Sequence, residues 1–268
     1  HERMVKEISA TGKRVEIIHI QELGGVSKAI MAGTNIARRL VIEASGMQRS
    51  PADISNVVMA IKCGASDTTS GMASNCVIGY VADRLVDLGA TVIFGETTEF
   101  IGGEHLLARR AVSKEVGDQI YTIVNKMEAR AKSLGCDMRK GQPTPGNIAG
   151  GLSSIEEKSL GAIVKSGTKP IQGVLDYPER VTNQKGLWIK DTPGREPEIL
   201  TGMAATGAQF MMFSTGRGAP QGFPSMPVIK ICGNPNTYER MEDDMDLNAG
   251  LIITGEKTIE QVGEEAFD

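Results

Sequence analysis

Seven short apolar runs, separated by segments with helical spacing, constrain the fold of this chain more than any other feature. The runs contain few polar residues and do not alternate between apolar and polar positions, so they are typical of strands that are covered on both faces of a parallel sheet. They are "VEIIHI" (15–20), "NVVMAIK" (56–62), "TVIFGE" (91–96), "IQGVL" (171–175), "GLWIK" (186–190), "QFMMFS" (209–214) and "PVIKIC" (227–232).

Helical patterns lie between several of these runs. The segments 25–44 and 71–89 carry apolar residues at helical spacing, and the segment 113–135 begins at a Ser113 cap and ends at Gly135. Strands that alternate with helices predict an α/β fold with a mainly parallel sheet of about seven strands and helices on both faces. We find no internal repeat and no linker long enough to divide two domains, and we predict a single domain over residues 1–268.

The composition excludes several classes of function. The chain has 29 basic and 33 acidic residues with the signs interspersed, and only 4% aromatic residues, so it offers no basic face for nucleic acid. No apolar run approaches the roughly 20 residues that a membrane span needs, and the start has no secretory pattern. The four cysteines lack metal or redox spacing. We predict a soluble, cytoplasmic chain without nucleic-acid or membrane partners, cut from a longer protein that begins before His1.

The stretch "KCGASDTTSG" places Cys63, Ser66 and Asp67 directly after the second run. Hard carboxylates suit divalent ions, so Asp67 and Cys63 are candidates for a metal or substrate site. In the alternative interpretation, Asp67 or a neighbouring hydroxyl only caps a helix that begins near Ser70.

A second polar cluster follows the third run in "GETTEFIGGEHLLARRA". Three carboxylates and an imidazole within ten residues would repel or crowd one another without a cation or a substrate. Alternatively, Glu104 is a first-turn helix acid and His105 a solvated side chain. The cluster consists of Glu96, Glu99, Glu104 and His105.

Three loops supply candidate substrate contacts. "TPGNIAGGLSSIEEKSLG" leads into a helix capped by Ser153 or Ser154, which favours an anion site with Lys158 one turn in, unless Lys158 is a surface residue. "STGRGAPQG" does not match the dinucleotide fingerprint, and Arg217 there is either a fork for a carboxylate or a solvated loop arginine. "MEDDMDLNAG" lacks the EF-hand pattern and is either a solvated helix end or a segment that turns Asp246 and Asn248 inward.

Taken together, these segments resemble the carboxy-terminal catalytic part of the altronate and galactarate dehydratase family. The resemblance runs from about residue 21 to the end, through "KCGASD", "ATVIFGETTE", "GEHLLARRAVS", "PTPGNIAGGLSSIEEKSLGAIVKSG", "STGRGAPQG" and "DDMDLNAG". It implies a Rossmann-like variant fold, a divalent metal (Fe2+ first, Mn2+ or Mg2+ as alternatives), and a homodimer with a separate or fused amino-terminal β-clip domain. "SDTTSGMAS" and "GNIAGGL" also resemble the related sulfolactate sulfo-lyase.

This resemblance implies a hydro-lyase that dehydrates a sugar acid to a 2-keto-3-deoxy acid. The alternatives are release of sulfite and pyruvate from sulfolactate, and a sugar-acid-binding module without catalysis. We assign metal ligation to Asp67, Glu96 and Cys63, and catalysis to His105, Lys158 and Glu99. We assign substrate binding to Ser66, Thr68, Asn147, Thr215, Arg217 and Asn248.

Overall fold

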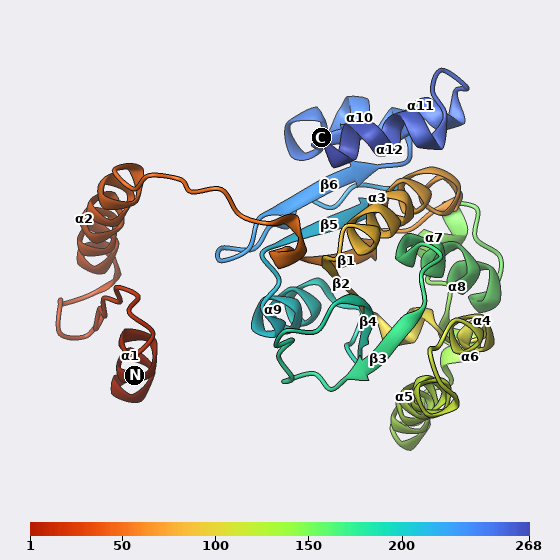
Figure 1. The fold of residues 1–268 in the computed structure, drawn as a ribbon, viewed down its shortest axis with the longest axis horizontal. Coiled ribbons are helices and arrows are strands. Elements are labelled where there is room, and N and C mark those ends of the chain that lie inside the picture. The colour runs from red at the N-terminus through yellow and green to blue at the C-terminus, as the bar shows by residue number, and fades with distance from the viewer. The chain divides into compact units, whose positions relative to one another are not determined.

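The computed structural model describes residues 1–268 as two compact units, His1–Ala52 and Asp53–Asp268. The first unit contains the helices α1 (Glu2–Ser9) and α2 (Val26–Ser45), and no residue of either helix is buried (Figure 1). The strand predicted at 15–20 is wrong, because this segment is an irregular loop. The first unit contains no strand, since every strand of the sheet belongs to the second unit.

The second unit is built around a seven-stranded sheet in the order β3-β4-β2-β1-β5-β6-β7, and every neighbouring pair is parallel. Six of the strands confirm predicted runs. The seventh, β7, has two residues and lies in the acidic segment that was predicted as a solvated helix end or as one that turns Asp246 and Asn248 inward. The strands are β1 (Val58–Gly64), β2 (Thr91–Phe94), β3 (Ile171–Leu175), β4 (Gly186–Lys190), β5 (Phe210–Thr215), β6 (Val228–Cys232) and β7 (Leu247–Asn248).

Helices cover both faces of the sheet, which confirms the predicted α/β class (Figure 1). Alternate residues of β1 enter two separate cores: Met59 and Ile61 pack with α3 and its neighbours, and Ala60 packs with α9. The helices of this unit are α3 (Asn75–Asp87), α4 (Glu104–Arg109), α5 (Lys114–Ser133), α6 (Met138–Gly141), α7 (Pro145–Ala149), α8 (Ile155–Ile163), α9 (Glu196–Thr206), α10 (Pro235–Arg240), α11 (Gly250–Ile253) and α12 (Ile259–Phe267).

The strand order places a topological switch point at β1. The chain continues from β1 to β2 on one side, and β5 later joins β1 on the other side. In open α/β sheets, ligands bind beyond the carboxyl ends of the strands at such a point. All of the predicted site residues lie in this second unit, and most of them follow the carboxyl ends of its strands.

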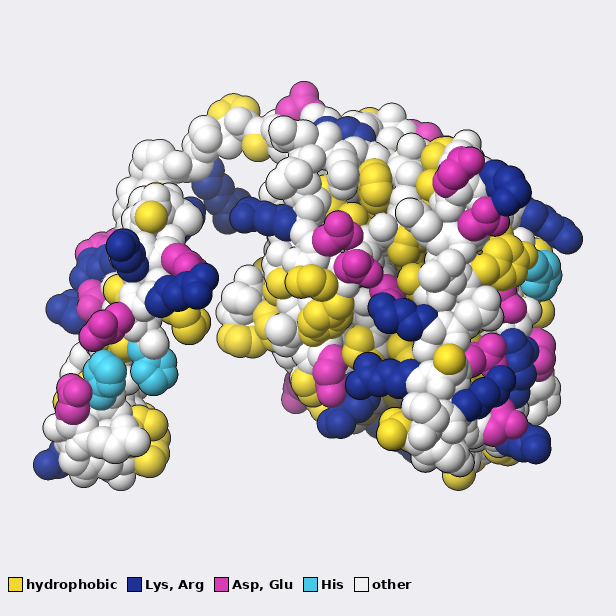
Figure 2. All heavy atoms as spheres, turned by 90° about the horizontal axis from the view of Figure 1, so that it is seen from below, with side chains coloured by type: hydrophobic (Ala, Val, Ile, Leu, Met, Phe, Trp, Pro, Cys, Tyr) yellow, Lys and Arg dark blue, Asp and Glu magenta, His cyan; other side chains and the backbone are white.

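The surface agrees with the charge pattern of the sequence. On the face shown in Figure 2, basic and acidic side chains are interspersed and form no large region of one sign. None of the helices is both long enough and apolar enough to cross a membrane.

Candidate active site

A buried cluster of charged residues lies at the carboxyl ends of β1 and β2, and Lys165 is at its centre. Lys165 belongs to a 3-10 turn that follows α8. Its Nζ lies 3.0 Å from Cys63 Sγ, 3.0 Å from Glu99 Oε2 and 2.9 Å from Glu96 Oε2. The Cys63 thiol donates to the same Glu99 oxygen at 2.8 Å. One ammonium group therefore contacts a sulfur atom and two carboxylates.

A second buried lysine contacts Glu96 from the other face of the sheet. Lys62 alternates with Cys63 along β1, so its side chain lies on the α9 side, over the Phe213 ring. Its Nζ is 3.1 Å from Glu96 Oε1 and donates to the carbonyl oxygens of Cys63 and Gly194 at 2.9 and 3.3 Å. Glu96 is thus held between two lysines, one from each face.

The pairing of β1 and β2 explains how these residues meet. Ile61 is paired with Phe94 in the parallel register, so Cys63 and Glu96, each two residues further on, come level with each other. The Cys63 N–H donates to Glu96 Oε2 at 2.8 Å. Glu96 adopts left-handed backbone angles (φ 70°), a conformation that costs roughly 1–3 kcal/mol in a residue other than glycine. Such strain at a strand end is typical of functional sites.

The charges of the cluster balance when Cys63 is a thiol. Burial favours the neutral carboxyl form of Glu99, but Lys165 and Lys158 outweigh this effect and lower its pKa to about 2. Burial and the nearby Glu99 carboxylate raise the pKa of Cys63 well above its ordinary value. Three lysines then face three carboxylates, because Lys158 is 3.9 Å from Glu99 and Glu196 is 3.4 Å from Lys62 Nζ. Because Glu99 is so acidic, it is better suited to holding a cation than to acting as a base near neutral pH.

The cluster has the donor types and the spacing of a metal site. Ligand atoms of Cys63, Glu96 and Glu99 all lie within 4.8 Å of one another, and all three residues are buried. A sulfur donor with two carboxylate donors is consistent with a divalent metal. Two of the three predicted ligands, Cys63 and Glu96, are brought together here. Asp67 is not part of this group.

Asp67 instead binds the start of the following helix. Its carboxylate accepts from the Ser70 N–H at 2.9 Å, the Thr69 hydroxyl at 2.7 Å and Asn234 Nδ2 at 3.2 Å. This is the geometry of the helix-cap alternative. A Cβ added to Gly216 would overlap the Asp67 carboxylate, so the loop after β5 packs directly against it.

Three of the other predicted residues lie beside Asp67. Asn147 Nδ2 donates to the Ser66 carbonyl at 2.8 Å, and Lys158 Nζ lies 3.3 Å from Asn147 Oδ1 and 3.9 Å from Glu99 Oε1. Lys158 therefore joins this region to the buried cluster. A cavity of about 20 Å³, enough for about one water, lies between these groups. It is lined by Ser66, Asp67, Ser70, Gly71, Asn75, Leu152, Lys158, Gly161 and Ala162.

Arg217 is exposed next to this region. Its guanidinium lies so close to Gly146, at the start of α7, that an added Cβ there would overlap it. The backbone N–H of Arg217 donates to the Ala65 carbonyl at 3.0 Å, but its side chain makes no hydrogen bond or ion pair with the protein. The Arg217 guanidinium is therefore free to bind an anion.

The remaining predicted residues make backbone contacts or lie outside the cluster. Thr68 bonds to the Gly150 carbonyl, Thr215 Oγ1 accepts from the Gly218 N–H at 3.1 Å, and Asn248 Oδ1 accepts from the Gly250 N–H at 2.9 Å. His105 is exposed on α4 and lines a separate hollow with residues of α5. The structure does not bring His105 into the buried cluster.

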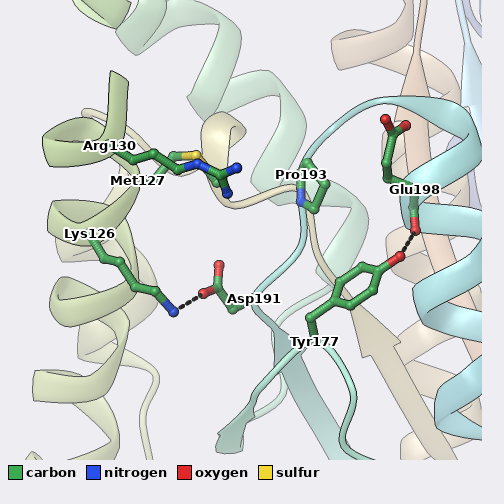
Figure 3. A pocket seen from close by; sticks show the side chains of 7 residues that line it. All are labelled: Lys126, Met127, Arg130, Tyr177, Asp191, Pro193 and Glu198. Atoms are coloured by element: carbon green, nitrogen blue, oxygen red, sulfur yellow. Dashed lines mark hydrogen bonds and ion pairs between the residues drawn. The ribbon is translucent and has the colours of Figure 1, made fainter. Parts of the chain in front are cut away.

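A larger cavity of about 590 Å³ opens between α5 and the ends of β3 and β4 (Figure 3). Lys126 is paired with Asp191 across it at 3.3 Å. Asp191 also accepts from Thr97, the residue after Glu96, at 2.8 Å. Asp191, in the wall of this cavity, therefore bonds to the residue next to Glu96 of the buried cluster. Its lining is Lys126, Met127, Arg130, Tyr177, Asp191, Pro193 and Glu198.

The sequence analysis missed Lys62 and Lys165 as site residues. Both are fully buried. The signal was present, because each lysine interrupts or closes an apolar stretch, "VVMAIKC" and "LGAIVKS". A lysine is rarely buried without a charged partner, so these positions indicate a buried ion pair.

The fold and the cluster define a class of protein. A parallel α/β sheet that ends on buried, paired acids and bases at its switch point is the arrangement of an α/β enzyme. More specifically, residues 54–268 match the family model described as D-galactarate/altronate dehydratase, C-terminal. The chain belongs to this family, which confirms the resemblance seen in the sequence.

Curated relatives include enzymes of two kinds. The chain is 38% identical over 268 residues to the (2R)-sulfolactate sulfo-lyase subunit beta of Chromohalobacter salexigens, covering 99% of this chain and 68% of that one. It is 41% identical over 232 residues to the galactarate dehydratase (L-threo-forming) of Escherichia coli, covering 87% and 44%. It is 34% identical over 240 residues to the altronate dehydratase of Bacillus subtilis, covering 90% and 47%. The chain thus spans less than half of either dehydratase.

Proposed function

We propose that this chain is the catalytic part of a hydro-lyase that dehydrates a sugar acid such as altronate or galactarate. In this reaction a base takes the proton next to the carboxylate of a 2-hydroxy acid, the hydroxyl at C3 leaves as water with a proton from a general acid, and the resulting enol tautomerises to a 2-keto-3-deoxy acid. The observation that carries the proposal is the buried cluster around Glu96. Each buried ion costs several kcal/mol of desolvation, and such a set at a sheet edge is better explained by chemistry than by stability.

Within this proposal, Cys63, Glu96 and Glu99 hold a divalent ion. When bound, the ion supplies a Lewis acid that stabilises negative charge as the proton next to the carboxylate is removed. We propose Fe2+, because a sulfur donor suits Fe2+ better than it suits Mg2+. Asp67 is then not a ligand of the ion, and it contributes by capping the turn that follows β1.

The residues around the small cavity bind and protonate the substrate. The Lys158 side chain is 14% exposed and lies 3.9 Å from Glu99, so it contacts both the cluster and the cavity. As an ammonium group it donates a proton to the departing hydroxyl. Arg217 binds a carboxylate with its free guanidinium, and Asn147 orients Lys158. We also propose that the chain forms a homodimer and works with an amino-terminal β-clip domain, separate or fused.

Elimination of sulfite from sulfolactate is the second candidate. It is favoured by the alignment with the sulfo-lyase subunit, which includes the first unit of this chain and covers 99% of it. Both reactions begin with the same deprotonation, but sulfite is a better leaving group than hydroxide and needs less help from an acid. Lys158 should therefore matter more for a hydro-lyase than for a sulfo-lyase.

An anaerobic assay with ferrous iron tests the proposal. Altronate, galactarate and sulfolactate are supplied separately, and 2-keto acid and sulfite are measured for the chain and for Lys158→Met. Keto acid from a sugar acid without sulfite, with a large loss in Lys158→Met, supports the hydro-lyase. Sulfite from sulfolactate supports the second candidate. Binding of a sugar acid without any product, in the full-length protein as well, would identify a binding module and refute both reactions.

A further inference from the structure

Lys165 makes the contacts that a metal ion in the cluster would make. Its ammonium group lies 2.9 to 3.0 Å from the same three side chains that form the possible metal site, Cys63, Glu96 and Glu99. The three donors are within 4.8 Å of one another, so a cation that bound all three would occupy nearly the same point as Nζ. Two cations at one point would also repel strongly in such a buried place.

We propose that the cluster has two mutually exclusive occupants, the Lys165 ammonium and a divalent ion, so that metal loading requires Lys165 to leave its present position. The inference rests on the proposed function, because it concerns the ion that we assign to this site. The Lys165 ammonium then competes with the metal. The apparent metal affinity equals the intrinsic affinity multiplied by the fraction of molecules in which Lys165 is withdrawn.

The surroundings favour movement of the side chain and not of the backbone. The 3-10 turn Val164–Ser166 packs tightly against α3, where a Cβ on Gly79 would come within 2.5 Å of the Val164 carbonyl oxygen. The backbone therefore has little room to shift. The flexible four-carbon side chain is therefore the part of Lys165 that would move away from the three donors.

Lys62 provides a matched control on the other side of Glu96. It carries the same charge and is equally buried, and it contacts Glu96 Oε1 at 3.1 Å. Its ammonium makes no hydrogen bond to the side chain of Cys63 or Glu99. Removal of Lys62 therefore reduces the local positive charge without vacating the point between the three donors.

The test measures Co2+ binding to the anaerobic protein without substrate, by thiolate-to-cobalt absorption and by dialysis. Three single variants are compared with the unmodified chain: Lys165→Gln, Lys165→Met and Lys62→Gln. Lys165→Gln keeps a hydrogen-bond donor. A double variant combines Lys165→Gln with Cys63→Ser. We expect Lys165→Gln to bind Co2+ about a hundredfold more tightly than the unmodified chain. We expect Lys62→Gln to gain less than about tenfold, as general electrostatics allows. The thiolate band should vanish with Cys63→Ser.

Equal gains for Lys165→Gln and Lys62→Gln would overturn the inference, because they would show a charge effect without competition for one position. An unchanged Co2+ affinity in Lys165→Gln, or a band that survives Cys63→Ser, would also overturn it. If Lys165→Met folds poorly without metal, a melting temperature that rises with Co2+ more than that of the unmodified chain supports exclusive occupancy. The absence of such a rise counts against it. Because no substrate is used, these results are independent of whether the chain turns over a sugar acid.

Discussion

Replacement of Lys62 by Met should destabilise the sheet unit strongly, because Lys62 is a buried ion with several partners. Its Nζ contacts Glu96 Oε1 at 3.1 Å and the carbonyl oxygens of Cys63 and Gly194. Removal of one partner of a buried ion pair costs about 3–5 kcal/mol. Because Glu96 keeps its contact with Lys165, we expect the lower half of this range. That is still a large part of the roughly 5–15 kcal/mol that stabilises a typical protein.

Urea unfolding followed by tryptophan fluorescence measures this loss. The single tryptophan, Trp188, lies in β4 and reports on the sheet unit. Lys114→Met is the control, because Lys114 forms an ion pair with Asp118 but its side chain is 83% exposed. Exposed pairs of this spacing contribute only about 0.3–0.5 kcal/mol. A loss in Lys62→Met within about 1 kcal/mol of that in the control would refute the reasoning.

A double variant identifies the source of the loss. If an underpaired Glu96 carboxylate causes much of it, Lys62→Met combined with Glu96→Gln should lose at least about 1 kcal/mol less than the sum of the two single losses. Strict additivity would mean that the carbonyl contacts, and not the charge of Glu96, account for the effect.

Three further variants test other parts of the site. Gly216→Ala should lose about 1–3 kcal/mol, since its Cβ would overlap Asp67, whereas Gly222→Ala, with no atom within 4 Å, should change little; equal urea midpoints would contradict this packing. Lys165 and Lys158 lower the pKa of Glu99 to about 2, so its ion pairs stabilise the fold above pH 4.5, and this stabilisation is lost as the pH falls from there towards 2. Glu99→Gln should flatten that part of the curve of unfolding free energy against pH, and an unchanged slope would contradict the assignment. Arg217→Lys should raise KM about tenfold with an unchanged melting temperature, since its guanidinium has no protein partner, and an unchanged KM would argue against substrate binding.

The fold could be predicted from the sequence because its strands are buried on both faces. Six apolar runs became strands, and Ser113 and Ser154 cap the helices that follow them, as predicted. The run at 15–20 failed because a strand depends on a partner as well as on its own residues. The two-residue strand β7 was missed because its pairing with β6 comes from tertiary contacts and not from an apolar pattern.

The site could be predicted only in part. Cys63, Glu96 and Glu99 were found because each lies at or just after the end of a strand, and strand ends meet at one edge. The partners that balance their charge were not found, since Lys165 comes from a turn 102 residues further along the chain than Cys63. Sequence distance hides such a contact, and an excess of acids without visible counter-charges led to the expectation of a metal.

The site keeps two properties apart, the chemistry of the buried cluster and the choice of substrate, so that relatives of this chain could vary one without the other. Cys63 and Glu96 are level with each other by strand register, and Lys62 and Lys165 are buried beside them, so under the proposed function a change there would disturb the deprotonation that both candidate reactions share. Arg217 is on an exposed loop and lacks protein partners, so it can change without loss of the fold. Substrate choice should therefore depend mainly on the loops after β5 and before α7, while the buried cluster keeps the common chemistry.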